Sequence, residues 1–379
     1  MAARPAAAVV GTGFIAPVHV EALRRLDVPL LGVAGSSPER AAEAGLGTVY
    51  ASLEELLGDD RVDVVHLTTP NHLHYPQVKQ ALTAGKHVVC EKPLALTAAD
   101  SRELVDDADA AGVVHCTNFM TRFYPLAQQA RALVQDGALG EIWNVHGSYL
   151  QDWLLRPTDW NWRLEPERGG KLRAVGDIGS HWLDLVQFVT GQRVAAVQAD
   201  LHTVLPIRRR PRGPVQTFAR QEAEGEDVAI ATDDLAHILL RFAGGARGAL
   251  VVSQVSAGRK NRLAFELAGA DAALAWNSER PEELWLGHRD RPNEVLLRDP
   301  SLMEQAARET TTLPGGHAEG FAETFRELYR RVYRAVESGG PPAEPDYPTF
   351  VDGHWENVLG EAIALSSQES RWVELEVER

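Results

Sequence analysis

The sequence predicts an α/β protein in which an N-terminal doubly wound parallel sheet is followed by an α+β region with a large, mostly antiparallel open sheet. Three observations support this prediction. Apolar strand-like runs alternate with helical patterns over residues 6–117, as parallel crossovers require. A glycine-rich turn joins the first of these strands to the first helix. After that region, strand-like runs follow one another without intervening helices, which is typical of an antiparallel sheet.

The length and composition predict a two-domain enzyme. A chain of 379 residues exceeds the size at which single hydrophobic cores stop growing, about 250–300 residues. We expect one domain over 1–120 and a second over 121–379, and the helix predicted over 349–366 is a candidate to pack back on the first domain. The net charge of −15 argues against nucleic acid and anionic membranes as partners, but it leaves room for a phosphate-bearing ligand in a local basic pocket.

The cysteines and the N-terminal residues indicate a cytoplasmic location. Cys90 and Cys116 each lie in an apolar strand-like run, so buried reduced thiols are expected rather than a disulfide or a metal pair. Residues 1–5 lead directly into the first strand and leave no room for a signal peptide. No apolar stretch approaches the roughly 20 residues that a membrane span needs.

The first strand and helix form a candidate nucleotide site. The strand over 6–10 leads into Gly11-Thr12-Gly13-Phe14-Ile15-Ala16, and apolar residues at helical spacing continue to Leu26. Glycine at 11 permits a tight turn, glycine at 13 lets the backbone approach a pyrophosphate, and a small residue at 16 allows close helix–strand packing. We expect the backbone of Gly11, Gly13, Phe14 and Ile15 to bind the pyrophosphate at the helix N-terminus.

The turn after the second strand bears on the choice of cofactor. This strand covers 30–34, and Gly35-Ser36-Ser37-Pro38-Glu39-Arg40 follows it. NAD sites usually place a carboxylate here for the ribose 2′-hydroxyl, whereas NADP sites offer hydroxyls and an arginine. Ser36, Ser37 and Arg40 therefore favour NADP over NAD. Ser37 is also suited to cap a helix that begins with Pro38, and this role is compatible with phosphate binding.

Further buried strands over 62–69, 87–90 and 113–117 alternate with helices over 76–84 and 98–111. Ligands of such sheets bind at the carboxyl ends of the strands. The candidate cofactor-binding residues at these ends are Thr69, Pro70, Asn71, His74, Glu91 and Lys92. The histidines at 66, 72, 74 and 87 fit the rim of this cofactor site, and they lack the compact ligand set of a zinc centre, so no metal is predicted.

The second region combines a few helices with many strands. Helices are predicted over 125–136, 178–190, 318–337 and 349–366, and strands over 195–201, 237–242, 248–256, 263–268, 284–287 and 372–377. A polar stretch over 206–227 contains an arginine cluster at 208–212. A solvated loop or a subunit contact explains this cluster better than a nucleic-acid site, because the whole chain is acidic.

The segment from Asp177 contains the candidate catalytic side chains. Asp177 stands at the predicted helix start, where a carboxylate can cap free N–H groups. His181 follows four residues later and Asp184 three residues after that, so the three project from one helical face. On spacing alone, a purely structural role explains the pattern as well as a catalytic one does. In that alternative, Asp177 caps the helix and His181 lies at a polar interface between the domains.

The ordered motifs of the chain resemble those of the glucose-fructose oxidoreductase, inositol dehydrogenase and MocA (Gfo/Idh/MocA) family. They are GTGFIA at 11–16, Thr69-Pro70-Asn71, Glu91-Lys92-Pro93, and Gly169-Gly170 followed by Asp177-x-x-x-His181-x-x-Asp184. The resemblance implies an N-terminal Rossmann domain and a C-terminal domain whose open sheet commonly supports dimers or tetramers. It also implies catalytic roles for Lys92, Asp177 and His181, and a cis bond before Pro93.

These roles agree with the chemistry of alcohol oxidation. As hydride leaves carbon, a base must take the hydroxyl proton, and a histidine with an ordinary pKa of about 6.5 is suited to this task. Lys92 can stabilise the developing alkoxide, and Asp177 can orient the substrate or the imidazole. The sequence leaves open whether Lys92 or His181 makes the final proton transfer.

The residues before the catalytic helix suggest the substrate class. Aromatic faces flanked by hydrogen-bonding groups suit a sugar or cyclitol, although core packing is a rival explanation for at least one tryptophan. The candidate substrate residues are Trp153, Trp160, Trp162, Arg163, Asp184 and His317. We therefore expect an oxidoreductase for a sugar, anhydrosugar, glycoside or inositol. The rival hypotheses are an NAD-dependent glycosidase of the same superfamily and a non-catalytic nucleotide-sensing regulator.

Overall fold

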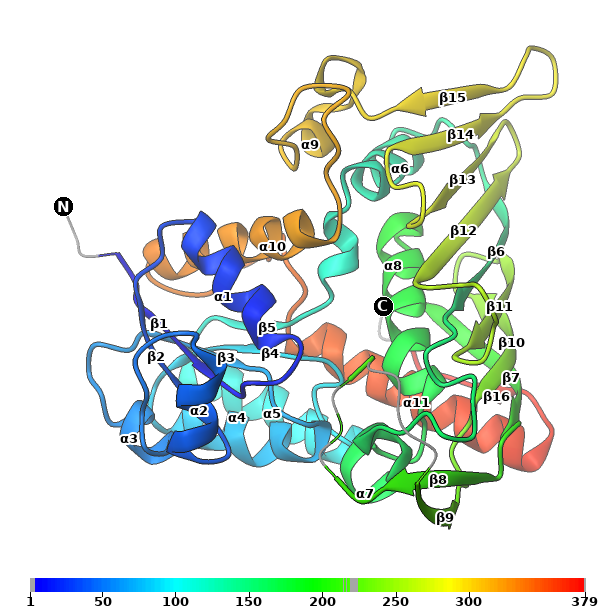
Figure 1. Cartoon of the computed structure of the whole chain (residues 1–379). Helices are drawn as coiled ribbons and strands as arrows, with labels where there is room; N and C mark the ends of the chain where they lie inside the picture. The colour runs from blue at the N-terminus through cyan, green and yellow to red at the C-terminus, as the bar shows by residue number, and fades with distance from the viewer. Residues whose placement is uncertain (1–3, 214, 216, 219–223, 378–379) are drawn as a thin grey trace. The chain divides into compact units, whose positions relative to one another are not determined.

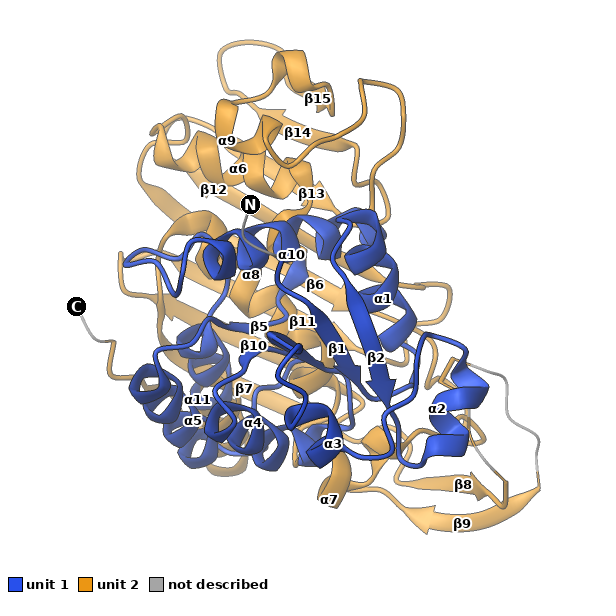
Figure 2. Ribbon diagram, turned by 90° about the vertical axis from the view of Figure 1, so that its left-hand side faces the viewer, with its two compact units in different colours: residues 1–120, 321–358 blue, residues 121–320, 359–379 orange. Residues whose placement is uncertain are grey.

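The computed structural model describes residues 4–213, 215, 217–218 and 224–377. The chain divides into two compact units, which Figure 2 shows in blue and orange. Unit 1 comprises residues 1–120 and 321–358, and unit 2 comprises residues 121–320 and 359–379.

Unit 1 contains a five-stranded parallel sheet with the order β2-β1-β3-β4-β5. The strands are β1 (Ala7–Val10), β2 (Leu30–Ala34), β3 (Val64–Leu67), β4 (His87–Cys90) and β5 (His115–Thr117) (Figure 1). The chain winds outward in both directions from β1 and β3, so the strand order reverses between them, and ligands of such sheets bind at this point. The predicted doubly wound sheet is confirmed.

Three of the helices of unit 1 begin at a side-chain cap. The helices of this unit are α1 (Ala16–Arg25), α2 (Pro38–Ala44), α3 (Leu53–Leu57), α4 (His74–Thr83), α5 (Ala98–Ala111) and α10 (Phe321–Glu337). The side chains of Ser37, Ser52 and Thr97 accept hydrogen bonds from the first turns of α2, α3 and α5. Apolar residues of the strands and helices, such as Leu67 and Leu104, are fully buried in one core.

Unit 2 contains a nine-stranded sheet with the order β15-β14-β13-β12-β6-β11-β10-β7-β16. The strands are β6 (Ile142–Leu150), β7 (Val194–His202), β10 (Leu235–Phe242), β11 (Arg247–Ser253), β12 (Arg262–Gly269), β13 (Ala273–Asn277), β14 (Glu283–Gly287), β15 (Glu294–Leu297) and β16 (Val373–Glu374). Among the described strand pairs of this nine-stranded sheet, only β6–β11 is parallel. The predicted mostly antiparallel sheet is therefore confirmed.

A glycine and a tryptophan fix helix α8 (Ser180–Thr190) against this sheet. Trp182 is fully buried, and its Nε1–H donates to the carbonyl of Ala264 on β12 over 2.8 Å. Gly147 of β6 makes room for the ring, because a Cβ at that position would lie 2.7 Å from Nε1 and 2.0 Å from the Ala264 oxygen. Helix α8 therefore has a fixed position on one face of the sheet.

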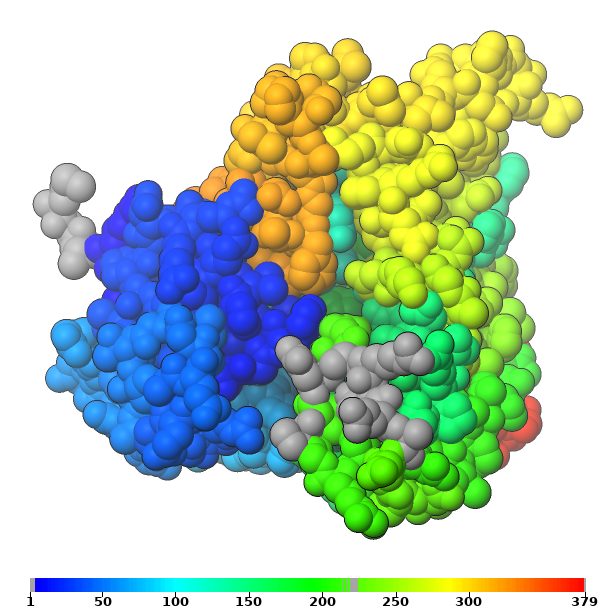
Figure 3. Space-filling view, in the orientation of Figure 1, coloured from blue at the N-terminus to red at the C-terminus, as the bar shows by residue number. Residues whose placement is uncertain are grey.

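The other helices of unit 2 are α6 (Pro125–Gln135), α7 (Pro166–Gly169) and α9 (Gln305–Arg308), and α11 (Phe350–Glu369) begins in unit 1 and ends in unit 2. The sheet face opposite α8 is accessible to solvent, since the paired side chains of His146 and Glu266 are 46% and 42% exposed. Figure 3 shows the segment of β14 and β15, in yellow, at the surface of unit 2.

The stretch over 206–227 differs from the predicted loop. It contains a two-stranded hairpin of β8 (Ile207–Pro211) and β9 (Gly225–Ala229). Cross-strand ion pairs join Arg209 to Asp227 and Arg210 to Glu226, so polar residues stabilise strands that carry almost no apolar pattern. Residues 214, 216 and 219–223 of this stretch lie outside the described residues.

The described part of the chain contains no helix that is both long and apolar enough to cross a membrane.

Candidate functional site

The turn between β1 and α1 has the geometry that a dinucleotide diphosphate needs. Gly11 has a φ of +103°, and a Cβ there would lie 2.6 Å from the hydroxyl oxygen of Thr68, so only glycine fits. A Cβ at Gly13 would meet nothing within 4 Å, which leaves that backbone open to a ligand. The first turn of α1 carries no acidic side chain that would repel a phosphate. The residues present therefore fit the diphosphate.

The turn after β2 carries no carboxylate before α2 begins. Ser37 caps α2, because its hydroxyl accepts the N–H of Arg40 at 3.3 Å. Ser36 and Arg40 are exposed beside it. A Cβ at Gly35 would lie 3.1 Å from the carbonyl of Ser37, so any larger residue there must displace its neighbours slightly.

His74 connects the segments that follow β3 and β4. Its Nδ1 lies 2.7 Å from the carbonyl of Pro93 and its Nε2 lies 2.8 Å from the carbonyl of Thr69. Burial lowers the pKa of His74 below its ordinary value. The peptide bond between Lys92 and Pro93 is cis, as the family resemblance implied. Asn71 is buried at the start of the turn that leads to α4.

Glu91 is a buried carboxylate directly before Lys92. Its Oε1 lies 3.0 Å from Nε2 of His19 and also accepts a hydrogen bond from Asn118. Burial acts to raise the pKa of Glu91, but the hydrogen bond and charge of His19, with smaller contributions from Lys92 and Asn118, outweigh it and lower the pKa to about 2. Glu91 is therefore ionised at neutral pH.

Sequence reasoning missed the aromatic network behind Glu91. Nδ1 of His19 lies 3.1 Å from Nδ1 of His66 and 2.8 Å from the hydroxyl of Tyr329, and Nε2 of His66 lies 3.1 Å from the hydroxyl of Tyr333. Burial and the nearby His19 lower the pKa of His66 well below its ordinary value. The tyrosines belong to α10, more than 200 residues away in the chain, so no local pattern indicates these contacts.

The predicted capping role of Asp177 is wrong. The helical segment begins before Asp177, and residues 175–179 form a π-helical turn ahead of α8. Asp233 caps this segment instead, because its carboxylate accepts the N–H groups of Arg173 at 2.6 Å and Val175 at 2.9 Å. The side chain of Asp177 is thereby left to make other contacts. Single π-helical turns often mark functional sites.

Two side chains hold the carboxylate of Asp177. Nε of Arg163 donates to Oδ1 over 3.0 Å, and Nε2 of Gln254 donates to Oδ2 over 2.9 Å. The guanidinium of Arg163 in turn lies 4.4 Å from the ring centre of Trp162. The structure thus joins three of the predicted residues, Asp177, Arg163 and Trp162.

His181 lies one helical turn further along, on α8, and is 6% exposed. The ring of Tyr149 on β6 lies 6.4 Å from its ring centre. The hydroxyl of Tyr149 donates to Asn261, which also accepts the side-chain N–H of Gln151, and Trp153 donates to Gln151. Tyr149 and Asn261 were not predicted. The only sequence signal for Tyr149 is the alternation of buried and exposed residues along β6.

The remaining predicted substrate residues are dispersed over unit 2. Asp184 is buried in an ion pair with Arg122, whose Nε donates over 2.8 Å. Trp160 packs in a small hydrophobic cluster with Leu154 and Leu164, as the core-packing alternative proposed. His317 is exposed in a loop whose carbonyls are held by the buried Arg298. The described residues include no group of three histidine, cysteine or acidic side chains that could hold a metal ion.

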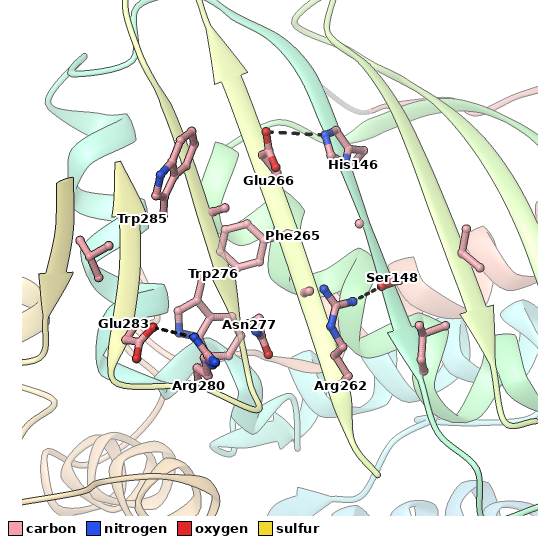
Figure 4. Close-up of a pocket in the computed structure, with 16 residues that line it drawn as sticks. His146, Ser148, Arg262, Phe265, Glu266, Trp276, Asn277, Arg280, Glu283 and Trp285 are labelled. Atoms are coloured by element: carbon pink, nitrogen blue, oxygen red, sulfur yellow. Dashed lines mark hydrogen bonds and ion pairs between the residues drawn. The ribbon is translucent and has the colours of Figure 1, made fainter. Parts of the chain in front are cut away.

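A groove lies on the accessible face of the unit 2 sheet, and Figure 4 shows it. Aromatic and charged residues of β6, β12, β13 and β14 line it. The labelled residues are His146, Ser148, Arg262, Phe265, Glu266, Trp276, Asn277, Arg280, Glu283 and Trp285.

A doubly wound sheet with a diphosphate-binding turn, and a second unit with an aspartate and a histidine on one helical segment, together define a nucleotide-dependent oxidoreductase of two units. The chain belongs to the Gfo/Idh/MocA family. Residues 6–119 match the model described as the oxidoreductase family with an NAD-binding Rossmann fold, and residues 127–275 match the Gfo/Idh/MocA C-terminal domain.

The similar proteins include a levoglucosan dehydrogenase and an inositol dehydrogenase homolog. Levoglucosan dehydrogenase of Pseudarthrobacter phenanthrenivorans is 29% identical over 97% of each chain. The structure of a levoglucosan dehydrogenase in complex with NADH and levoglucosan superposes with a TM-score of 0.86 at 28% identity, covering 98% of this chain and 99% of that one. An inositol dehydrogenase homolog from Azotobacter vinelandii, with NADH and myo-inositol, has a TM-score of 0.83 at 27% identity and 98% coverage of both chains.

The low pKa of Glu91 predicts a specific pH dependence of stability. Because the folded-state pKa of about 2 lies below the ordinary value of 4.5, the carboxylate stabilises the fold above pH 4.5, and this contribution is lost as the pH falls toward 2. Between pH 5.5 and 3.5, the wild type should lose about 1 kcal/mol more unfolding free energy than Glu91→Gln, as urea unfolding can measure. Glu21→Gln, on the exposed face of α1, is the control. Parallel pH curves for the wild type and Glu91→Gln would contradict the prediction.

Proposed function

We propose that this protein is a cytoplasmic NAD(P)-dependent dehydrogenase that transfers a hydride between nicotinamide and a secondary hydroxyl or keto group of a sugar, anhydrosugar, glycoside or inositol. Unit 1 holds the nucleotide and unit 2 holds the substrate. The observation that carries the proposal is the fixed carboxylate of Asp177, which Arg163 and Gln254 hold one helical turn before His181. The buried thiols of Cys90 and Cys116 support a reducing compartment.

The proposed chemistry divides among three side chains. The nicotinamide, when bound, supplies the hydride acceptor or donor. His181 takes the hydroxyl proton during oxidation and returns it during reduction, since an imidazole nitrogen can both accept and donate a proton. Lys92 is carried by the rigid carboxyl end of β4 and stabilises negative charge on the substrate oxygen. Asp177, held in one orientation, aligns the substrate hydroxyl or the imidazole of His181.

The side chains around this region favour a polyhydroxylated substrate. Trp153, Gln151 and Asn261 form a hydrogen-bonded series that starts from Tyr149 beside His181. Trp162 presents an aromatic ring against the guanidinium of Arg163. Aromatic rings cover the C–H face of a sugar, whereas planar amides and guanidinium groups bind its hydroxyls. The substrates named for the similar proteins, levoglucosan and myo-inositol, belong to the same chemical class.

The test of this function is nucleotide reduction across a panel of sugars, anhydrosugars, glycosides and inositols, followed by absorbance of the reduced nicotinamide. Lys92→Ala and His181→Ala should each lower turnover at least about a hundredfold, as expected for the loss of an electrostatic or acid–base group. Nucleotide binding should stay nearly intact, because both variants keep the glycine turn and the other candidate cofactor-binding residues, so the loss of Lys92 alone should weaken it far less than it lowers turnover.

Lys171→Ala and His237→Ala, which remove an exposed lysine and an exposed histidine side chain of unit 2, are the controls. Unchanged turnover in both Lys92→Ala and His181→Ala would remove the catalytic assignment. Cleavage of a glycoside without net nucleotide reduction would instead identify a glycosidase, and nucleotide binding without any turnover would identify a regulator.

We further propose that NADP(H) binds at least as tightly as NAD(H). Support comes from the turn after β2, where Ser36 and Arg40 are exposed and no carboxylate lies between β2 and the cap of α2. Gly35→Asp should weaken NADP(H), because it places a negative charge near the 2′-phosphate, and should affect NAD(H) less. Dissociation constants of both nucleotides provide the measurement.

The control for this substitution is Gly35→Ala, since a Cβ alone already approaches its neighbours to 3.1 Å. A wild type that strongly prefers NAD(H), together with an unchanged preference in Gly35→Asp, would show that Ser37 and Arg40 are only a helix cap and a surface charge.

The accessible sheet face supports a homodimer or homotetramer. Small residues alternate with larger ones across the sheet, since Ala275 on β13 pairs with Trp285 and Ala249 on β11 pairs with His146, and such small residues would let a second copy approach closely. Ala275→Arg should therefore reduce the mass measured by sedimentation velocity, whereas Ala110→Arg on the exposed side of α5 should not. A wild-type monomer, or an unchanged oligomer in Ala275→Arg, would contradict this assembly.

A further inference from the structure

A series of buried polar contacts ends at the carboxylate of Asp177. Gln254 is fully buried after β11, and its Nε2 donates to Oδ2 of Asp177 over 2.9 Å. Its Oε1 accepts a hydrogen bond from the guanidinium of Arg173 over 3.1 Å. Arg173 is ion-paired with Asp234, which is also paired with Arg208 at 2.6 Å. Contacts between residues far apart in sequence thus link the hairpin that begins at β8 to the proposed catalytic aspartate.

These contacts leave the amide of Gln254 only one orientation. An arginine side chain can only donate hydrogen bonds, so the amide oxygen must face Arg173. An ionised carboxylate can only accept them, so the amide nitrogen must face Asp177. The backbone N–H of Gln254 also donates to the carbonyl of Asp234 over 3.0 Å, which fixes the position of the residue itself.

Consecutive aspartates hold both parts of Arg173. Asp233 accepts the backbone N–H of Arg173, and Asp234 pairs with its guanidinium. The second oxygen of Asp234 accepts the N–H of Leu205 at 2.8 Å, so the carboxylate cannot turn away. The side chains of Arg173, Arg208 and Asp234 are 0% exposed, which leaves them little freedom to change partners.

Stability alone does not explain this cluster. Buried ion pairs lose much of their attraction to desolvation, and well-packed apolar residues of similar size stabilise a core as well or better. The cluster does fix the orientation of the Gln254 amide, so that its N–H group donates to one oxygen of Asp177. Arg163 holds the other oxygen at 3.0 Å from a different segment of the chain.

We propose that Gln254 is a positioning residue that holds the carboxylate of Asp177 in its reactive orientation, and that Arg173 and Asp234 fix the orientation of the Gln254 amide. The inference rests on the proposed dehydrogenase function and assigns that site a further residue. Gln254 touches neither hydride donor nor acceptor in this role, and it acts only through Asp177.

The first variant is Gln254→Met, which keeps the length of the side chain but removes both of its polar atoms. We expect kcat with the best substrate of the panel to fall about ten- to a hundredfold. Activity falls by a similar factor in metal enzymes when a residue that orients a metal-binding side chain is removed. The dissociation constant of the nucleotide should stay unchanged. Gln198→Met, on β7 of the same sheet, is the matched control.

The second variant, Gln254→Glu, is nearly isosteric and provides a readout that a purely structural role would not change. Its carboxylate would face Asp177 across 2.9 Å, with Arg173 and Arg163 as the nearest cations. Because two adjacent carboxylates cannot easily both ionise, the ratio of variant to wild-type kcat should be lower at pH 8 than at pH 6. A shared proton at the lower pH restores the hydrogen bond to Asp177.

The outcomes separate this inference from the proposed function. A wild type inactive on the whole panel would remove the dehydrogenase function itself. An active wild type, an inactive Asp177→Asn and a kcat of Gln254→Met within twofold of wild type would overturn the positioning role alone. A lowered kcat in Gln254→Glu with the same ratio at pH 6 and pH 8 would likewise overturn it, because the loss would then be structural. The isosteric glutamate variant decides the question if the methionine variant does not fold.

Discussion

The cap that Asp233 places on the segment before α8 is the interaction on which the geometry of unit 2 depends. A helix start needs acceptors for its first N–H groups, and the residue in the ordinary capping position is not the one that supplies them here. Because Asp233 lies about 60 residues away, at the turn into β10, it supplies the acceptor and ties the helix start to the sheet at the same time. Burial raises the pKa of Asp233 to about 6 against the opposing effect of these backbone hydrogen bonds. The fold therefore accepts the cost of a buried carboxylate to hold this segment.

That external cap leaves the side chain of Asp177 available for the proposed chemistry. A carboxylate that caps its own helix is committed to backbone N–H groups and points along the helix axis. In this protein, Asp177 stands inside a π-helical turn, and its oxygens face Arg163 and Gln254. The other end of the segment is anchored by Trp182 against Ala264, so His181 and Asp177 are held between two fixed points. Rigid support of this kind is what proton transfer requires, since small displacements of a reacting group lower its rate.

Much of the fold could be predicted from the sequence because short, local sequence patterns determine it. The alternation of apolar strands and capped helices gives the parallel sheet, and Gly11 can be recognised because only glycine fits its backbone conformation. The hairpin of β8 and β9 could not be predicted in this way, because charged pairs such as Arg210 and Glu226 stabilise it in place of apolar alternation. The cap by Asp233 could not be predicted either, because Asp177 stands near the expected start of the helix and is a plausible capping residue in its own right.

The proposed active site shows the same division between local and distant information. Lys92 and the glycine turn can be read from short motifs, because a nucleotide is bound largely through backbone geometry at strand ends. The polar partners of the site residues come from elsewhere in the chain, as with Tyr329 on α10 near His19 and Gln254 near Asp177. Such contacts involve single polar residues in apolar surroundings. The periodicity of the sequence indicates that these residues are buried, but it does not indicate which residue each of them contacts. Most buried polar atoms have a partner of opposite kind, however, so the structure determines the orientation of a group that lies between a donor and an acceptor, as Gln254 does. Motifs thus indicate the residues that we propose to react, and polar contacts between distant segments determine how their side chains are oriented.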